Sequence, residues 1–269
     1  MNAPEKKAEL EPLVLERRDR GVVHVTLNRP NQFNSLSEEM LAALHATLQK
    51  IARDSTARVV VLGGAGKAFC AGHDLKQMKA NPDVEYYRKV FADCTRLMML
   101  VQTMPQPVIA RVHGIATAAG CQLVAMCDLA VASTDARFAV SGINVGLFCS
   151  TPAVALSRNV DRKRAFEMLV TGEFIDAATA KHRGLINRVA EPDQLDAEIA
   201  KLTDAIVAKP AMAIALGKDL FYRQAEMGIE AAYQLAGQTM ACNMIDGVAQ
   251  EGVQAFFDKR PPKWEPPPA

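Results

Sequence analysis

Hydrophobic residues in the first half of the chain alternate between two spacings. Short runs rich in β-branched residues predict strands at 22–27, 59–62, 108–112 and 129–132. After the first run, apolar residues at helical spacing predict a helix capped by Ser37; its apolar face comprises Leu41, Leu44, Leu48 and Ile51. The small apolar residues of 114–126 predict a turn and a short buried helix. This alternation predicts an α/β fold built from β-α-β units.

The pattern changes after residue 161, where apolar residues follow helical spacing with one strand-like stretch at 186–189. The second half is therefore expected to be mostly helical. The candidate helix caps and breaks are Asp176, Pro192, Asp193, Pro210 and Gly228.

The composition is that of a folded protein without a dominant charge. The chain has 269 residues, and its 49% hydrophobic content argues against disorder and supports a sizeable core. Basic and acidic residues leave a formal charge of only +1, so no overall field attracts nucleic acid or an anionic membrane. The uncharged stretch 112–127 is too short to span a bilayer. We expect neither nucleic acid nor membrane as a partner.

The cysteines and the N-terminal composition bear on location. The six cysteines show no C-x-x-C spacing and are scattered through apolar stretches, which predicts buried thiols in a reducing compartment. Residues 1–15 mix acidic, basic and proline residues and do not resemble a signal or transit peptide. These observations predict a cytoplasmic protein.

Several common catalytic motifs are absent from the sequence. A phosphate loop is suggested by Gly63, Gly64, Gly66 and Lys67. The first glycine of that motif is not at the required spacing, however, and Ala68 replaces the Ser or Thr that binds the metal. A dinucleotide fingerprint, a zinc motif and a G-x-S-x-G nucleophile elbow are also missing. We therefore expect no metal site.

Three segments together resemble the crotonase family, also called the enoyl-CoA hydratase/isomerase superfamily. They read KAFCAGHDL at 67–75, HGIATAAGCQLVAMCDLAVAS at 113–133 and EGVQAFFDKRPPKW at 251–264. Flanking segments at 27–36 and 167–189 also fit, so the resemblance covers nearly the whole chain in order. The segment NVGLFCSTP, residues 144–152, points to one subgroup of the family.

The resemblance implies an α/β crotonase-like fold, a spiral of β-β-α units followed by a helical region that trimerises. We expect the spiral core at 1–200 and the helical region at 201–269, with a homotrimer or a dimer of trimers as the assembly. The implied ligand is an acyl-CoA, in which coenzyme A is part of the substrate and no further cofactor is needed.

The resemblance also assigns residues to the thioester. It implies that the backbone N–H groups of His73 and Ala119 form an oxyanion hole for the thioester carbonyl. Ala119 replaces the usual glycine of the family, so a positive φ there would be strained. The residues implied on the coenzyme A side are Asn31, Gln32, Phe33, Ala71 and Leu75, with Lys259 reaching phosphate from a neighbouring subunit. Lys259 is equally expected on a solvated helix end, and we interpret Asp128 and Arg137 as structural.

The chain departs from the family where hydratases carry a pair of glutamates. Gln122 occupies the first position, and Gly142 occupies the second, within FAVSGINVG at 138–146. An amide cannot take up a proton near neutral pH and glycine has no side chain, so acid/base catalysis of about 10² to 10⁴-fold per group is lost. The candidate substitutes are Ser150, which falls where some members are acidic, and Cys149, Thr151, Thr117 and the His73 side chain.

The sequence thus predicts an acyl-CoA enzyme of the enoyl-CoA hydratase/isomerase family that stabilises an enolate but hydrates enoyl-CoA weakly or not at all. Two alternatives remain open. One is another crotonase-family reaction: decarboxylation, thioester hydrolysis or isomerisation. The other is a protein that binds a CoA ligand without catalysis.

Overall fold

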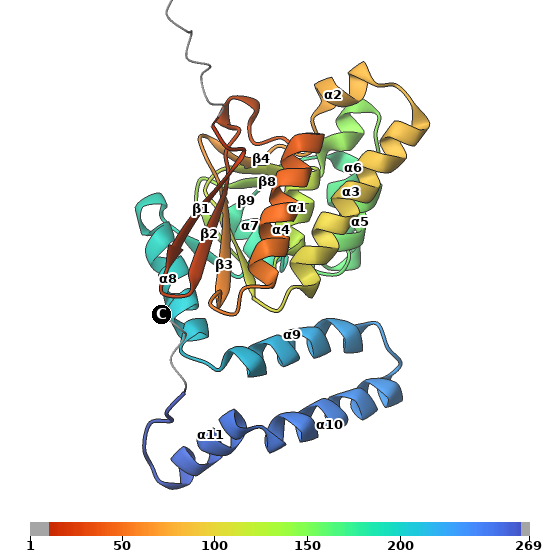
Figure 1. Ribbon diagram of the computed structural model, residues 1–269. Helices are drawn as coiled ribbons and strands as arrows, with labels where there is room; N and C mark the ends of the chain where they lie inside the picture. Colours follow the sequence, from red (N-terminus) through yellow and green to blue (C-terminus); the bar gives the residue numbers. More distant parts are fainter. Residues whose placement is uncertain (1–10, 265–269) are drawn as a thin grey trace, which may run out of the picture.

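The computed structural model describes residues 11–264, whose strands form two sheets (Figure 1). The larger sheet has the strand order β1-β2-β3-β5-β7-β10 and the smaller has the order β4-β6-β8-β9. The strands of the larger sheet are β1 (Val14–Asp19), β2 (Val22–Leu27), β3 (Val59–Gly64), β5 (Val108–Val112), β7 (Leu129–Ser133) and β10 (Arg188–Ala190). Those of the smaller sheet are β4 (Ala68–Cys70), β6 (Ile115–Thr117), β8 (Arg137–Ala139) and β9 (Ile175–Asp176).

Strand direction follows from the connections. β1 and β2 form an antiparallel hairpin whose two loop residues, Arg20 and Gly21, both have positive φ, as a type I′ turn requires. From β2 to β10 the larger sheet is parallel, and β4, β6 and β8 are also parallel. The pairs β3–β4, β5–β6 and β7–β8 each add one strand to each sheet before a helix follows, so the predicted spiral of β-β-α units is confirmed.

Helices cover both faces of the larger sheet. In β3, Val60 and Leu62 belong to the main core, while Val59 and Val61 pack on the other face with Ile199 of α8. This two-sided burial explains the continuous β-branched run, because a buried parallel strand has no solvent face. The helices before the C-terminal region are α1 (Glu38–Ala52), α2 (Leu75–Ala80), α3 (Val84–Thr103), α4 (Ala119–Met126), α5 (Ser150–Leu156), α6 (Arg162–Thr171), α7 (Ala177–His182) and α8 (Leu195–Val207).

Most predicted local features are present. Ser37 caps α1 by accepting a hydrogen bond from the amide of Met40 at 3.2 Å, and Asp176 caps α7 through Thr179. Asp193 was expected to cap a helix, and this prediction is wrong. Asp193 lies inside the short 3-10 helix η3 (Pro192–Gln194), and α8 begins only after it. Five of the cysteines are buried, but Cys242 is exposed.

The C-terminal helices are α9 (Ala211–Ala225), α10 (Ile229–Ile245) and α11 (Gly247–Phe257), with α9 and α10 side by side below the core (Figure 1). The division expected at residue 200 falls inside α8, which packs on the larger sheet.

A buried ion pair attaches α9 to the core. Lys218 donates to Asp128 at 2.7 Å and to the carbonyls of Val101 and Gln106, each at 2.9 Å. The other carboxylate oxygen of Asp128 accepts from Tyr222 at 2.8 Å. Asp128 therefore has a structural role. Its network with Lys218 and Tyr222 holds α9, which makes few other contacts with the core.

Within residues 11–264, no helix combines the length and the apolar character needed to cross a membrane.

Candidate functional site

A cavity of about 340 Å³ brings together residues of the segments 67–75 and 113–133, two of the three that carry the family resemblance. Its walls come from the segment after β4, from α2 and α3, from the beginning of α4, and from η2 (Ser141–Val145) and α5. Eight of the residues named from the sequence line it: His73, Ala119, Gly142, Cys149, Ser150, Thr151, Ala71 and Leu75.

The segment at residues 71–74 is held so that the amide of His73 stays free. The amide of Leu36 donates to the carbonyl of Gly72 at 2.7 Å, and the carbonyl of Leu36 accepts from the amide of Asp74 at 3.3 Å. Leu36 thus bonds to the residues on both sides of His73 but not to the amide of His73 itself. Asp74 then caps α2 through Lys76 and Gln77. Among the described residues, the N–H of His73 has no protein acceptor.

The segment before α4 ends in a sharp turn. Ala118 has φ 51° and ψ −120°, the conformation of the first central residue of a type II′ turn, which normally requires glycine. The strain predicted for Ala119 therefore lies one residue earlier, because Ala119 is already the first residue of the helix. Such a conformation costs of order 1–3 kcal/mol and is typical of functional sites. Like that of His73, the N–H of Ala119 has no acceptor within residues 11–264.

The two free amides belong to segments in direct contact. A Cβ atom at Gly72 would lie only 3.1 Å from the amide nitrogen of Ala119 and 2.9 Å from the Cβ of Ala118. Gly72 also has φ 90°, which a side chain would strain. Glycine is therefore required for this approach, and both His73 and Ala119 line the cavity.

His73 is itself one of the residues that line the cavity. Its ring packs edge-on against Phe91 of α3, with the ring centroids 5.4 Å apart. Both ring nitrogens are buried, and neither has a hydrogen-bond partner in the described part of the protein. Burial lowers the pKa of His73; the carbonyl of Leu36 partly offsets this shift without reaching hydrogen-bond geometry. The ring is therefore neutral at pH 7.

The two positions where the resemblance expects glutamates differ in their surroundings. Gln122 is buried in α4 and does not line the cavity, and its Oε1 atom has no partner among residues 11–264. Gly142 does line the cavity, but a Cβ atom there would lie 2.5 Å from the carbonyl oxygen of Leu147 and 2.7 Å from Sγ of Cys149. The loop from Ser141 to Cys149 has thus folded over the space that a side chain would need.

Hydroxyl and thiol groups line the same side of the cavity. Ser150 bonds to the carbonyl of Phe148 at 3.3 Å, and Ser141 bonds to Thr117 at 2.8 Å. Burial raises the pKa of the Cys149 thiol, while the amide of Gly142 opposes the shift. Cys149 is therefore a protonated thiol at pH 7 and a poor nucleophile.

The residues expected on the coenzyme A side lie apart from the cavity wall, except for Ala71 and Leu75. Asn31 and Gln32 are exposed in η1 (Pro30–Gln32) and followed by Phe33, which is 52% exposed. The carbonyl of Phe33 accepts from the amide of Ala71 at 3.0 Å, so this loop lies at the rim. Lys259 is exposed after α11 and is not part of the cavity.

Sequence reasoning missed part of the apolar wall. The additional lining residues are Met78, Phe91, Val145, Leu147, Phe148 and Pro152. Phe91 had no signal beyond its place in a helical pattern, since the packing of α3 against the site depends on the tertiary fold.

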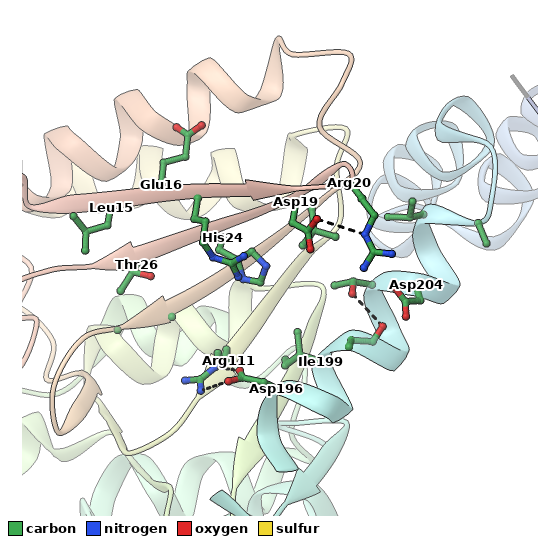
Figure 2. A pocket seen from close by; sticks show the side chains of 18 residues that line it. Leu15, Glu16, Asp19, Arg20, His24, Thr26, Arg111, Asp196, Ile199 and Asp204 are labelled. Atoms are coloured by element: carbon green, nitrogen blue, oxygen red, sulfur yellow. Dashed lines mark hydrogen bonds and ion pairs between the residues drawn. The ribbon is translucent and has the colours of Figure 1, made fainter. Parts of the chain in front are cut away.

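A larger cavity of about 840 Å³ lies between β1, β2, β3 and α8. Figure 2 shows its charged lining, in which Arg111 and Asp196 face one another and are 2.5 Å apart, with His24 nearby on β2. It contains none of the predicted site residues, so the smaller cavity is the candidate site. Within residues 11–264, no cluster of three or more His, Cys, Asp or Glu side chains could hold a metal ion.

Comparison with known proteins agrees with the geometry. The model of the family described as enoyl-CoA hydratase/isomerase matches residues 17–267. The enoyl-CoA hydratase domain-containing protein 3, mitochondrial, of Xenopus laevis is 44% identical over 94% of this chain and 86% of its own length. Its human counterpart has a crystal structure with a TM-score of 0.91 and 41% identity, covering 94% of this chain and all of that one. An enoyl-CoA hydratase of Mycobacterium smegmatis is 67% identical with a TM-score of 0.94, over 94% of this chain and 99% of that one.

These comparisons correct one prediction. The names of the vertebrate relatives include the word mitochondrial, which contradicts the expected cytoplasmic location. That expectation rested mainly on residues 1–15, of which 1–10 lie outside the described residues. Composition of a short segment is a weak guide to the compartment.

The comparisons also agree with the subgroup that residues 144–152 indicated, because relatives from five vertebrates share the name enoyl-CoA hydratase domain-containing protein 3. Together, the family match, the spiral fold and the two segments that meet at the cavity show that this chain belongs to the enoyl-CoA hydratase/isomerase family.

Proposed function

We propose that the protein binds the acyl group of an acyl-CoA thioester in the 340 Å³ cavity and stabilises an enolate through the backbone amides of His73 and Ala119. The observation that carries this proposal is the contact of the two segments through Gly72, together with two amides that have no acceptor among the described residues. Free N–H groups beside an apolar cavity are costly unless a ligand oxygen accepts from them. An enolate oxygen, which carries more charge than a carbonyl, gains most from such donors.

The cavity supports chemistry other than efficient hydration. Within the described part of the chain, none of the side chains that line it is a carboxylate. Addition of water to an enoyl-CoA needs one group to activate the water and one to protonate carbon. Since Gln122 and Gly142 stand at the positions of the family glutamates, we infer that hydration of short enoyl-CoA is weak or absent.

Coenzyme A itself enters this proposal as part of the substrate, with its pantetheine passing Ala71 and Leu75 toward the rim formed by Asn31, Gln32 and Phe33. The amide of Ala71 bonds to the carbonyl of Phe33, which connects cavity and rim. Phe33 is exposed and offers an aromatic face. We keep Lys259 as a phosphate contact supplied by a neighbouring subunit.

The C-terminal helices support an oligomer. Large apolar side chains on α9, α10 and α11 are more than 60% exposed in the single chain: Phe221, Ile229, Tyr233, Met240, Ile245, Phe256 and Phe257. Exposed apolar patches of this kind mark interaction surfaces. We propose that they form the interface of a homotrimer, which can pair into a dimer of trimers.

Two measurements on one sample test the function. Calorimetry with butyryl-CoA should show binding that competes with crotonyl-CoA. Absorbance at the enoyl thioester band should show that crotonyl-CoA turnover is at most about 10⁻² of that of a hydratase carrying both glutamates. This limit follows because each absent group is worth about 10² to 10⁴-fold. Failure of every thioester to bind would refute the proposed function. A full hydratase rate would refute the inference about Gln122 and Gly142 alone.

A further inference from the structure

We propose that the imidazole of His73 is the proton-transferring group of this cavity and removes a proton from the α-carbon of an acyl-CoA whose acyl group is uncharged. This inference rests on the proposed function and extends it by naming the base and the substrate class. His73 would then act twice, because its amide holds the thioester oxygen and its side chain moves the proton.

The position of the ring follows from covalent geometry. The amide and the imidazole belong to one residue, so an oxygen bound at that amide lies within one side chain's length of the ring. The α-carbon of an acyl thioester is two bonds from the carbonyl oxygen. His73 also contributes to the cavity wall, so a base on this residue approaches the correct carbon without any movement of the backbone.

The unliganded ring has no competing partner. Both of its nitrogens are buried and unbonded within residues 11–264, although the large majority of buried side-chain polar atoms in proteins are paired. The ring packs edge-on against Phe91, and the nearby carbonyl of Leu36 forms no hydrogen bond with it. A rotation about its side-chain bonds that turns a nitrogen toward a ligand therefore breaks no hydrogen bond and relieves an unsatisfied group.

The surroundings keep the ring in its basic form. Its pKa is lowered by burial, and no charged side chain contributes to the shift. The adjacent Asp74 is paired with Arg29 at 2.7 Å and is engaged at the beginning of α2. A neutral imidazole at pH 7 can accept a proton, whereas an imidazolium cannot.

The other candidates in the cavity are less suited to this task. Among the described lining residues, His73 and Cys149 carry the only titratable side chains. The raised pKa of Cys149 keeps its thiol protonated. Gly142 has no room for a side chain, and Gln122 neither lines the cavity nor carries a basic group.

The proposed step balances without a co-reactant. A ring nitrogen takes the proton from the α-carbon, and the electrons of the broken C–H bond form the enolate, whose oxygen accepts hydrogen bonds from the amides of His73 and Ala119. Return of a proton from the imidazolium to the α-carbon regenerates the thioester. When the proton on the imidazolium exchanges with heavy water before it returns, the α-position becomes labelled with deuterium.

The lining also limits the acyl group. Within the described part of the chain, no Lys, Arg, Asp or Glu side chain faces this cavity. A carboxylate on the acyl group would be buried without a counter-ion, which is strongly unfavourable. We therefore expect butyryl-CoA to bind at least ten-fold more tightly than malonyl-CoA.

The experiment follows deuterium entry into the α-position of butyryl-CoA by mass spectrometry, in heavy water with the full-length protein. We expect wild-type protein to catalyse exchange and His73→Gln, which keeps the amide, to lose about 10² to 10⁴-fold. The matched control is His182→Gln, because His182 is exposed on α7 and outside the cavity; its rate should equal that of wild type. Circular dichroism and butyryl-CoA affinity confirm that each variant is folded and competent to bind.

The pH profile of the wild-type protein tests the same claim without a variant. The exchange rate should rise through a pKa below the ordinary histidine value of about 6.5 and stay level to pH 8. A rate that rises only above pH 9 would instead indicate the Cys149 thiol. Unchanged exchange in His73→Gln, or binding of butyryl-CoA with no exchange by wild type, would overturn the role of His73. Equal or tighter binding of malonyl-CoA would overturn the substrate class, whereas no binding of either thioester would refute the proposed function itself.

Discussion

The crowding around Gly142 predicts that even the smallest side chain there will destabilise the protein. In Gly142→Ala, the new Cβ atom would lie 2.5 Å from the carbonyl oxygen of Leu147, whereas ordinary contacts begin at 3.4 Å. The carbonyl must retreat by about 1 Å, and Sγ of Cys149, at 2.7 Å, must also move. The loop is not free to do so, because the amide of Leu147 bonds to the carbonyl of Gly142 at 3.0 Å.

The magnitude follows from these two disturbances. Overpacking of a well-packed site costs about 1–3 kcal/mol, and loss of one hydrogen bond adds about 1 kcal/mol. We expect the free energy of unfolding to fall by about 2–4 kcal/mol. Denaturant unfolding at equal protein concentration, followed by circular dichroism, measures this change. The midpoint denaturant concentration should fall, while the dependence of the unfolding free energy on denaturant concentration stays the same.

A matched control isolates the steric effect from the general effect of replacing glycine. Gly217 lies in α9 with nothing within 4 Å of an added Cβ atom, so Gly217→Ala should leave stability unchanged or raise it by up to about 1 kcal/mol. A Gly142→Ala variant within about 0.5 kcal/mol of wild type would refute the reasoning. By the same argument, the Gln122→Glu, Gly142→Glu double variant should not gain crotonyl-CoA hydration even where it still binds the thioester.

Three further predictions concern other parts of the molecule. Lys218→Met should lower the free energy of unfolding by about 3–5 kcal/mol, because it leaves the Asp128 carboxylate buried without its cation; adding Asp128→Asn should restore part of the loss, and an additive double variant would contradict this coupling. Ser37→Ala should cost about 1 kcal/mol through loss of the α1 cap, and an effect below 0.3 kcal/mol would contradict it. Since the pKa of His73 is lowered in the folded state, the unfolded chain takes up the proton at higher pH than the folded one. The free energy of unfolding should therefore fall as pH drops below about 6.5. This fall should be shallower in His73→Gln, and an identical dependence on pH in the variant would contradict the assignment.

The core of the fold could be predicted because burial on both faces of a parallel sheet leaves a strong pattern. The runs at 22–27 and 108–112 coincide with β2 and β5, and Ser37 begins α1 as its side-chain chemistry requires. The short strands of the second sheet were not anticipated. β4, β6, β8 and β9 contain only two or three residues each, too few for a period to appear, and their pairing depends on contacts between distant segments.

The site could be predicted only where a motif carries it. His73, Ala119 and Ala71 line one cavity, as the two family segments suggested, but the close contact at Gly72 that joins these segments became visible only in the structure. The strain at Ala118 was misplaced by one residue, since the first residue of α4 could not be read from composition. The folding of the loop over Gly142 had no signal, because a glycine in the sequence shows that a side chain is missing but not what fills its space.

The most direct test of the central claim is the carbonyl stretching frequency of ¹³C-labelled butyryl-CoA bound to the protein, measured by infrared difference spectroscopy. If the amides of His73 and Ala119 both donate to the thioester oxygen, the band of the bound ligand will lie at lower frequency than that of the free ligand. A bound thioester whose carbonyl band stays at its solution position would contradict the account.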